Sequence, residues 1–358
     1  MPRLALLDPT RTGTQAEDLE KKLRHLIIGQ DEAIHQIVRT YQTYLAGLSS
    51  VGRPIGNFLF LGPTGSGKTR TVEATAEALV GNPRAVIKID CAELQHSHEI
   101  AKLIGSPPGY LGHRETHPLL TQEALDQHHT DTVKLSFLLF DEIEKATDAL
   151  WNLLLGILDK ATLTLGDNRK VDFSKALIFL TSNIGAAEMT SLLSPKLGFQ
   201  LPSPDDNSSA SKLKARLSRT GVEAARRKFT PEFLNRLDRI VVFKALGNEE
   251  LNRIIDIELE SVQQRIQTSA AKKPFFINVT NGAREFLLSE GTDFRYGARP
   301  LKRAIERLLV QPLSNLMATG QIDSCDRIRV AHNDGSPFLT FFREADDWEV
   351  RKVDGVAA

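Results

Sequence analysis

The sequence predicts an α/β protein with a parallel sheet flanked by helices, followed by a smaller, mostly helical C-terminal domain. Three observations predict this class. Short apolar runs alternate with helical patterns over the first part of the chain, a glycine-rich segment directly follows the first of these runs, and helical periodicity dominates after about Leu246. Apolar strands that alternate with helices are typical of a parallel sheet covered on both faces.

The expected strands of the large domain are short and bounded by turn residues or by helices. They are Asn57–Leu61, Ala85–Ile89, Phe137–Phe140 and Ala176–Leu180. Helical spacing of apolar residues predicts helices over Asp31–Leu48, Thr71–Leu79 and Asp148–Lys160. We therefore expect a large domain over residues 25–246, preceded by an N-terminal arm over residues 1–24.

The second domain is expected over residues 247–335, with a tail over residues 336–358. Its helical segments are Glu249–Gln267, Gly282–Ser289 and Pro300–Ala318, and its short strands are Arg327–Val330 and Phe338–Phe342. Most of this domain is thus expected to be helical, because the apolar residues of the longer segments recur at helical spacing.

Composition excludes several classes of protein. The 358 residues include 45 Lys and Arg and 45 Asp and Glu, so the net charge gives no bulk support for nucleic-acid binding. Cys91 and Cys325 are too few for a disulfide framework and suit a reducing compartment. No stretch approaches a signal-peptide core or a membrane span. We expect a cytoplasmic protein.

A phosphate-binding loop is predicted where the first strand meets a helix. The motif G-x-x-x-x-G-K-[ST] is matched by Gly62, Pro63, Thr64, Gly65, Ser66, Gly67, Lys68 and Thr69. The glycines let backbone N–H groups and the helix N-terminus face a phosphate. Lys68 would contact the β- and γ-phosphates of ATP, and the Thr69 hydroxyl would ligate Mg²⁺. The alternative is a glycine-rich turn that matches by chance.

A pair of carboxylates follows the strand Phe137–Phe140. Asp141 would lie at the carboxyl edge of the sheet, within reach of a Mg²⁺ ion, and Glu142 would polarise the attacking water as a general base. The alternative is an acidic cap at the start of a helix, which is the weaker interpretation downstream of a phosphate-binding loop.

The order of these motifs resembles the second nucleotide-binding module of Clp-type AAA+ unfoldases and disaggregases, from about Ile27 to Ile322. The resemblance implies an AAA+ large domain with a helical lid domain. The segment Ile27-Ile28-Gly29-Gln30 resembles the adenine-contacting segment of that family, with Ile27 and Ile28 as the contacting residues, and the alternative is an apolar lead-in to a helix. Asn183, in Thr181-Ser182-Asn183, resembles sensor 1, which orients the lytic water; the alternative is a polar turn.

Two arginines carry family roles by the same resemblance. Arg236, in Phe229–Asp238, matches the arginine finger, which reaches the site of a neighbouring subunit and therefore implies an oligomer. Arg299, in Tyr296–Arg303, matches sensor 2 of the lid domain, which contacts the nucleotide phosphates. The alternatives are a solvent-facing ion pair for Arg236 and a purely structural helix start for Arg299.

A substrate-gripping pore loop is implied at Gly105–Gly112, where Gly109, Tyr110 and Leu111 would present an aromatic-aliphatic pair to an extended polypeptide. The alternative is a tyrosine folded over its own core. The sequence departs from the family directly afterwards, because His113–Pro118 replaces an acidic, glycine-rich stretch. His113 and His117 share a helical spacing, but no Cys or carboxylate completes a metal set, and solvated or pore-lining histidines are favoured.

The tripeptide Leu197, Gly198 and Phe199 resembles the segment with which some Clp unfoldases dock on a peptidase ring. The alternative is that it fixes the following polar loop to its own subunit. Short motifs of this kind often match by chance.

Taken together, the resemblance implies an ATP-dependent protein unfoldase or remodelling chaperone. Its cofactors would be ATP and Mg²⁺, its substrate a polypeptide, and its assembly a homo-oligomeric ring, most simply a hexamer. The main alternative is an AAA+ nucleic-acid loader with a basic channel, whose binding would weaken steeply with salt. A nucleotide-binding scaffold without hydrolysis is disfavoured by the complete set of catalytic residues.

Overall fold

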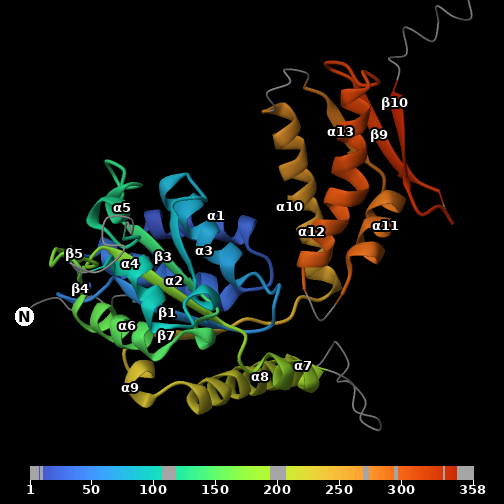
Figure 1. Cartoon of the computed structure of the whole chain (residues 1–358). Coiled ribbons are helices and arrows are strands. Elements are labelled where there is room, and N and C mark those ends of the chain that lie inside the picture. The colour runs from blue at the N-terminus through green and yellow to red at the C-terminus, as the bar shows by residue number, and fades with distance from the viewer. Residues whose placement is uncertain are drawn as a thin grey trace, which may run out of the picture. The chain divides into compact units, whose positions relative to one another are not determined.

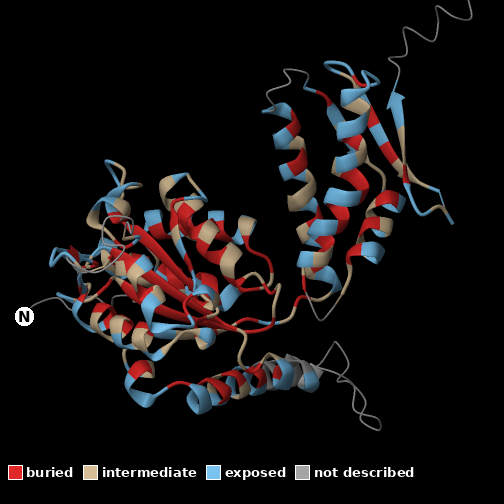
Figure 2. Cartoon of the chain, in the orientation of Figure 1, coloured by how far each residue is buried: buried red, intermediate tan, exposed pale blue. Residues whose placement is uncertain are grey.

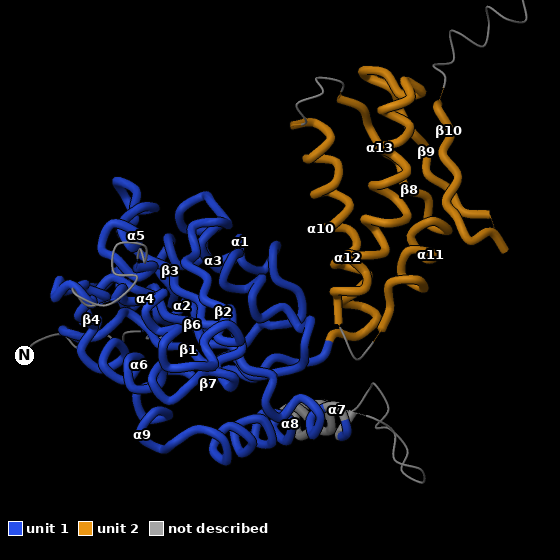
Figure 3. The backbone as a smooth tube through the Cα atoms, viewed as in Figure 1, with its two compact units in different colours: residues 1–245 blue, residues 246–358 orange. Residues whose placement is uncertain are grey.

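The computed structural model describes residue 8 and residues 11–106, 118–193, 207–268, 274–293, 297–333 and 335–344. The chain forms two compact units, Met1–Ala245 and Leu246–Ala358 (Figure 3). The division lies beside the boundary expected at residue 246. Each unit has its own apolar core and is described by itself.

A parallel five-stranded sheet forms the centre of unit 1, with the strand order β2-β3-β6-β1-β7 (Figure 1). Its strands are β1 (Gly56–Leu61), β2 (Val86–Asp90), β3 (Ser136–Asp141), β6 (Ala176–Ser182) and β7 (Arg239–Val242). The predicted α/β class with a parallel sheet is confirmed. The edge strand β7 was not predicted.

Both faces of this sheet are covered, which explains why the sequence of its central strands is apolar throughout. Every residue of β1 and β6 is buried (Figure 2). Alternate residues of β1 enter different cores: Phe58 and Phe60 join one cluster, and Leu59 and Leu61 join the other. Successive side chains of a strand point to opposite faces, so the sheet separates two apolar layers.

Helices α1 (Thr14–Leu26), α2 (Asp31–Leu45) and α3 (Lys68–Val80) supply the first layer. The structure corrects the predicted arm over residues 1–24, because α1 is not separate from the large domain. Its residues Ala16, Leu19 and Leu23 are buried in the same core as Phe58 and Phe60. Their spacing places them on one face of a helix, where they pack against the core.

The second layer contains α6 (Asp148–Lys160) and several shorter elements. The remaining elements of unit 1 are η1 (Cys91–Glu93), η2 (Ser97–Ile100), α4 (Ala101–Ile104), α5 (Gln122–Asp126), η3 (Ile143–Lys145), the antiparallel pair β4 (Thr162–Thr164) and β5 (Lys170–Asp172), α7 (Ala186–Leu193), α8 (Asn207–Lys228) and α9 (Pro231–Leu234).

Trp151 of α6 packs edge-on against Phe233, 4.7 Å between ring centroids, and against Phe229. These rings attach the α8–α9 segment to the core.

Unit 2 combines helices with a three-stranded sheet of order β10-β9-β8. Its elements are α10 (Asn248–Gln267), β8 (Phe276–Val279), α11 (Asn281–Gly291), α12 (Arg299–Ile305), the π-helical turn η4 (Glu306–Val310), α13 (Gln311–Ala318), β9 (Arg327–His332) and β10 (Leu339–Glu344). The predicted tail over residues 336–358 therefore includes a strand of this sheet. Helices α11 and α12 approach closely at Gly291, where a Cβ would lie 2.6 Å from Leu301 Cα.

Within the described residues, no helix combines the length and the apolar character needed to cross a membrane.

Candidate nucleotide-binding site

The phosphate-binding loop joins β1 to α3, as its mechanism requires. Gly62 follows the last residue of β1, and a Cβ there would lie 2.7 Å from the carbonyl oxygen of Phe243. Gly67 precedes α3 in a left-handed conformation, with φ of 96°. Glycine is needed at both positions, at the first for space and at the second for conformation. The N-terminus of α3 thus opens directly onto the loop.

Lys68 is the first residue of α3 and is buried. Its Nζ donates hydrogen bonds to the carbonyl oxygens of Gly62 at 2.7 Å and Pro63 at 2.9 Å, and to Asn183 Oδ1 at 2.9 Å. These acceptors hold the ammonium group inside the loop, where a bound anion would compete for it. A lysine in this position supplies a point charge to the phosphates of a nucleotide.

Thr69 and Asp141 come from separate elements and meet beside the loop. The Thr69 hydroxyl donates to Asp141 Oδ2 over 3.4 Å, although Asp141 ends β3 and Thr69 lies in α3. The other oxygen of Asp141 accepts a hydrogen bond from the Thr181 hydroxyl, at the end of β6. A hydroxyl and a carboxylate are the hard oxygen ligands that suit Mg²⁺.

Glu142 has a left-handed backbone, with φ of 55° and ψ of 47°, which is uncommon for a residue with a side chain. Its backbone N–H donates to the Thr181 hydroxyl at 3.1 Å, and its carboxylate forms an ion pair with Lys145. The hydrogen bond and the charge of Glu142 raise the pKa of Lys145. A left-handed residue at the end of a strand turns its side chain away from the strand direction, and such conformations cluster at functional sites.

Asn183 joins the two halves of the site. Its Oδ1 accepts from Lys68 and lies 3.4 Å from the Thr64 hydroxyl, while its Nδ2 donates to Glu142 Oε1 at 3.3 Å. Its backbone N–H donates to Glu144 Oε1 at 3.0 Å. The structure therefore brings Lys68, Thr69, Asp141, Glu142 and Asn183 together at the carboxyl ends of β1, β3 and β6.

Three further residues hold this cluster together, and their contacts were not predicted from the sequence. Thr181 binds Asp141 and Glu142, Glu144 holds the Asn183 backbone, and Gln30 holds the loop at Ser66. Thr181 lies in the Thr181-Ser182-Asn183 segment and Gln30 in the Ile27-Ile28-Gly29-Gln30 segment, both of which the sequence singled out for other roles. The sequence around Glu144 contains no pattern that would have singled it out.

Ile27 and Ile28 are buried just before α2. Ile27 belongs to the apolar cluster of α1, α2 and α3, which is the packing expected of an apolar lead-in to a helix. Gln30 follows them and contacts the carbonyl oxygen of Ser66 at 3.0 Å, so the segment lies beside the phosphate loop. An adenine contact at this position stays a prediction.

Arg236 lies at the other end of the sheet. Its carbonyl oxygen accepts from Asn57 Nδ2 at 3.3 Å, near the start of β1, whereas the phosphate loop follows the end of that strand. A strand rises about 3.3 Å per residue, so Asn57 and Gly62 are roughly 16 Å apart. The guanidinium group is turned toward Glu232, 3.3 Å away, and Asp159, 3.9 Å away. The structure thus does not bring Arg236 to the phosphate loop of its own chain.

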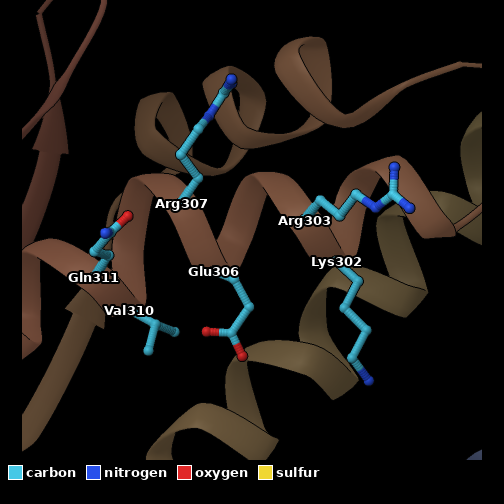
Figure 4. Close-up of a pocket in the computed structure, with 6 residues that line it drawn as sticks. All are labelled: Lys302, Arg303, Glu306, Arg307, Val310 and Gln311. Carbon is cyan, nitrogen blue, oxygen red and sulfur yellow. The ribbon is translucent and has the colours of Figure 1, made fainter.

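Arg299 begins α12 of unit 2 and is exposed. On the same helical stretch, an open cleft of about 500 Å³ is lined by Lys302, Arg303, Glu306, Arg307, Val310 and Gln311 (Figure 4). Ion pairs account for much of its charge: Lys302 pairs with Glu258 at 3.6 Å, and Glu306 with Arg265 at 2.7 Å. These pairs tie α12 and η4 to α10, and every residue that lines the cleft comes from the single helical stretch 302–311.

Several predicted residues lie outside the described part of the chain. They are the pore-loop residues Gly109, Tyr110 and Leu111, the histidines His113 and His117, and the docking tripeptide Leu197, Gly198 and Phe199. Among the residues that are described, no group of three or more His, Cys, Asp or Glu side chains is arranged to hold a metal ion.

A serine, a histidine and an aspartate also meet at the start of β3. His129 Nε2 lies 3.0 Å from Ser136 Oγ, and His129 Nδ1 lies 3.3 Å from Asp126 Oδ1. Ser136 is buried, and its hydroxyl donates to the Leu125 carbonyl oxygen at 2.9 Å. Its proton is therefore already engaged and its oxygen is covered. The cluster stabilises the start of β3, and its Ser136 hydroxyl is not available as a nucleophile.

Comparison with known proteins places this site in a family. A family model described as "AAA domain (Cdc48 subfamily)" matches residues 53–240, and one described as "C-terminal, D2-small domain, of ClpB protein" matches residues 246–330. The chaperone protein ClpB of Bdellovibrio bacteriovorus is 38% identical over 326 residues, which are 90% of this chain and 34% of that protein. The ATP-dependent Clp protease ATP-binding subunit ClpC of Staphylococcus saprophyticus is 36% identical over 92% of this chain and 38% of its own length.

Solved structures agree with this assignment. The S. cerevisiae Hsp104–ADP complex has a TM-score of 0.75 at 29% identity, covering 93% of this chain and 54% of that chain. The present chain spans about a third of the length of the relatives it matches. The predicted resemblance is confirmed by both the large-domain and the small-domain matches. The chain belongs to the Clp-type AAA+ ATPase family, and it corresponds to the second nucleotide-binding module of those proteins.

Proposed function

We propose that this chain hydrolyses ATP and uses the reaction to unfold or remodel polypeptides in an oligomeric ring. One observation carries the proposal: Asn183 contacts both the Lys68 ammonium and the Glu142 carboxylate, so the phosphate-binding and water-activating groups converge on one point. A nucleotide-binding scaffold without hydrolysis would not need that convergence.

The residues of the loop fit a nucleotide. The Ser66 hydroxyl is buried and makes no hydrogen bond within the described residues, and open space lies where a side chain at Gly67 would be. Lys68 would neutralise the β- and γ-phosphates. Glu142 would accept a proton from the attacking water, and Asn183 would orient that water. These groups are preorganised by hydrogen bonds to one another, which reduces the reorganisation needed during the reaction.

Thr69 and Asp141 are proposed to hold Mg²⁺. Their oxygens lie 3.4 Å apart beside the loop, and the second Asp141 oxygen is fixed by Thr181. A bound Mg²⁺ supplies charge neutralisation for the transferring phosphoryl group. The contribution of this chain is to hold one hydroxyl and one carboxylate oxygen on the same side of the loop.

The position of Arg236 supports an assembly of several copies of the chain. Because Arg236 lies near the start of β1 and the phosphate loop at its end, a finger role requires a neighbouring copy of the chain. A homo-hexamer is the assembly we propose. Arg299 is proposed to contact the phosphates from unit 2, and Ile27 and Ile28 the adenine.

A polypeptide substrate is supported by the relatives. They are named chaperone proteins, and one similar structure is described as "Closed State CryoEM Reconstruction of Hsp104:ATPyS and FITC casein", with a TM-score of 0.73. We propose that Gly109, Tyr110 and Leu111 grip an extended polypeptide. An aromatic face binds such chains largely without regard to sequence. The cytoplasm is the proposed compartment, in keeping with two free cysteines, of which Cys325 is exposed.

Docking on a peptidase through Leu197, Gly198 and Phe199 is a further proposal, supported by the similarity to a Clp protease subunit. It is tested by co-purification with a Clp peptidase. Phe199→Ala should abolish binding if the tripeptide docks, and unchanged binding would remove the proposal.

The decisive experiment measures ATP hydrolysis with casein, with duplex DNA and with neither, for the wild type and Glu142→Gln. We expect casein to stimulate hydrolysis and Glu142→Gln to lower it by about 10²–10⁴-fold, the usual contribution of a general base. Nucleotide binding by Glu142→Gln should persist. Stimulation by DNA alone would favour the loader alternative, and hydrolysis unaffected by Glu142→Gln would exclude the assigned base.

A further inference from the structure

Gln30 is a buried polar side chain that joins two distant parts of unit 1. It lies just before α2 and is only 5% exposed. Its Nε2 donates to the carbonyl oxygens of Ser66 and Lys244, each at 3.0 Å, and its Oε1 accepts from the Lys244 N–H at 3.2 Å. One carboxamide therefore holds residues that lie 36 and 214 positions away in the chain.

The two segments that Gln30 joins have different roles. Ser66 belongs to the phosphate loop, between Gly65 and Gly67. Lys244 directly precedes Ala245, the last residue of unit 1, so it lies where the chain leaves for unit 2. Gln30 thus connects the loop that would hold the phosphates with the segment that leads into the second unit.

A second contact joins the same two segments. The Phe243 N–H donates to the Leu61 carbonyl oxygen at 2.7 Å, and the Phe243 carbonyl oxygen lies where a Gly62 side chain would be. Phe243 therefore touches the first residue of the loop, while Lys244 is linked through Gln30 to Ser66 near its end. Residues 243 and 244 therefore contact the start of the phosphate loop directly and its end through Gln30. A change in the shape of the loop would have to move them or break these contacts.

Only a carboxamide satisfies this arrangement. The Nε2 group supplies two donors and Oε1 one acceptor, which match two carbonyl oxygens and one N–H. A glutamate would offer no donor to either carbonyl, and a buried acceptor left without its donor costs free energy. The three segments therefore either move together or break buried hydrogen bonds.

We propose that Gln30 is a positioning residue that couples the phosphate loop to the chain segment entering unit 2, so that the nucleotide state of the loop is passed to that unit. This inference rests on the proposed function, since it takes the loop to bind nucleotide. Gln30 acts through Ser66 and Lys244 and has no part in the chemistry.

The test compares Gln30→Glu and Gln30→Met with a matched control. Gln263 of unit 2 makes the same kind of bridge, donating to the Phe275 carbonyl oxygen at 2.8 Å and accepting from the Ile277 N–H at 2.9 Å. Gln263→Glu and Gln263→Met therefore disturb two hydrogen bonds of the same kind away from the loop, against three at Gln30. Thermal unfolding of all four variants measures how much each bridge stabilises the fold, independently of any coupling to nucleotide.

The readout is a thiol-reactive dye on Cys325, which is exposed in unit 2, whereas burial of Cys91 raises the pKa of its thiol and keeps it unreactive. Energy transfer from a fluorescent ADP or ATPγS to this dye reports the change in unit 2 between the two nucleotides. We expect the Gln30 variants to retain nucleotide binding within about tenfold, the scale of one or two lost hydrogen bonds. We expect them to lose at least half of the change in energy transfer.

The Gln263 variants should retain the wild-type change at a comparable loss of thermal stability. A wild-type change in both Gln30 variants, or an equal loss in the Gln263 variants, would overturn the coupling role. Failure of the wild type to hydrolyse ATP while the dye still responds to nucleotide would instead count against the proposed function.

Discussion

The Lys68 ammonium donates a hydrogen bond to the carboxamide oxygen of Asn183, 2.9 Å away. Lys68 opens α3 and Asn183 follows β6, so this contact joins the phosphate loop to the adjacent strand of the sheet. The nitrogen of the same carboxamide reaches Glu142. Asn183 therefore links the Lys68 ammonium group, which would contact the phosphates of a bound nucleotide, to the Glu142 carboxylate, which would activate water.

Replacing Lys68 by alanine should weaken ATP binding by about 10- to 100-fold. A charged hydrogen bond contributes about 1.5–3 kcal/mol, and each 1.4 kcal/mol corresponds to roughly a factor of ten. Titration with a fluorescent ATP analogue measures the effect. Lys88→Ala is the control, because Lys88 pairs with Glu73 on the surface. Equal losses in the two variants would contradict the assigned role.

Arg236→Ala and Glu142→Gln should each abolish most hydrolysis alone, yet mixtures of the two should regain activity. In a mixed ring, an intact Glu142 from one chain meets an intact Arg236 from the next. Fingers of this type contribute on the order of 10³–10⁵ in rate. Hydrolysis measured against the mixing ratio checks the prediction, and mixtures as inactive as the separate variants would show that Arg236 does not act across subunits.

Stability should fall as the pH is lowered below about 6.5, and His129 should account for part of that fall. Burial lowers the pKa of His129 in the folded chain. The unfolded chain therefore binds more protons in this window, so the His129 contribution is complete above the unfolded pKa and is lost as the pH falls.

Thermal midpoints between pH 5 and pH 8 test the His129 prediction. His129→Gln should flatten the dependence, whereas His98→Gln, at an exposed position, should leave it unchanged. A slope that survives His129→Gln would assign the dependence to other groups.

Leu23→Ala should destabilise unit 1 by about 2–5 kcal/mol, the usual cost of emptying a fully buried leucine site. Leu23 is 0% exposed although it lies in the segment predicted to be an arm. Urea unfolding followed by Trp151 fluorescence, in a Trp348→Phe background, measures the change. Lys21→Ala, on the exposed face of α1, should change stability by no more than about 0.5 kcal/mol. A neutral Leu23→Ala would mean that α1 is not part of the core.

The sequence predicted the central strands because their burial on both faces requires uninterrupted apolar runs. Strand β7 was missed because it lies at the edge of the sheet and only Val241 is fully buried, so its apolar pattern is short. Strand β8 was missed for a similar reason, since its residues alternate between exposed and half-buried. Edge strands depend on neighbours that are distant in the sequence, and local pattern carries little of that information.

The candidate site was predictable where a motif fixes both residue and geometry. The phosphate loop and the Asp141–Glu142 pair are of this kind, since each sits at the end of a buried strand. The bridging contacts of Gln30 were not predicted, although its segment was singled out, because they are hydrogen bonds to residues far along the chain. Such contacts become visible only once the sheet has placed the strand ends side by side.

The separation of Arg236 from its own phosphate loop determines how many complete catalytic centres an assembly of these chains can have. On the proposed arrangement, every complete catalytic centre belongs to an interface and not to a chain. A closed ring then has as many complete centres as subunits, whereas an open spiral of the same subunits has one fewer. At the open end of a spiral, one chain has no neighbour to supply Arg236 to its nucleotide. Hydrolysis by that chain would require a rearrangement that brings a neighbouring Arg236 to its site.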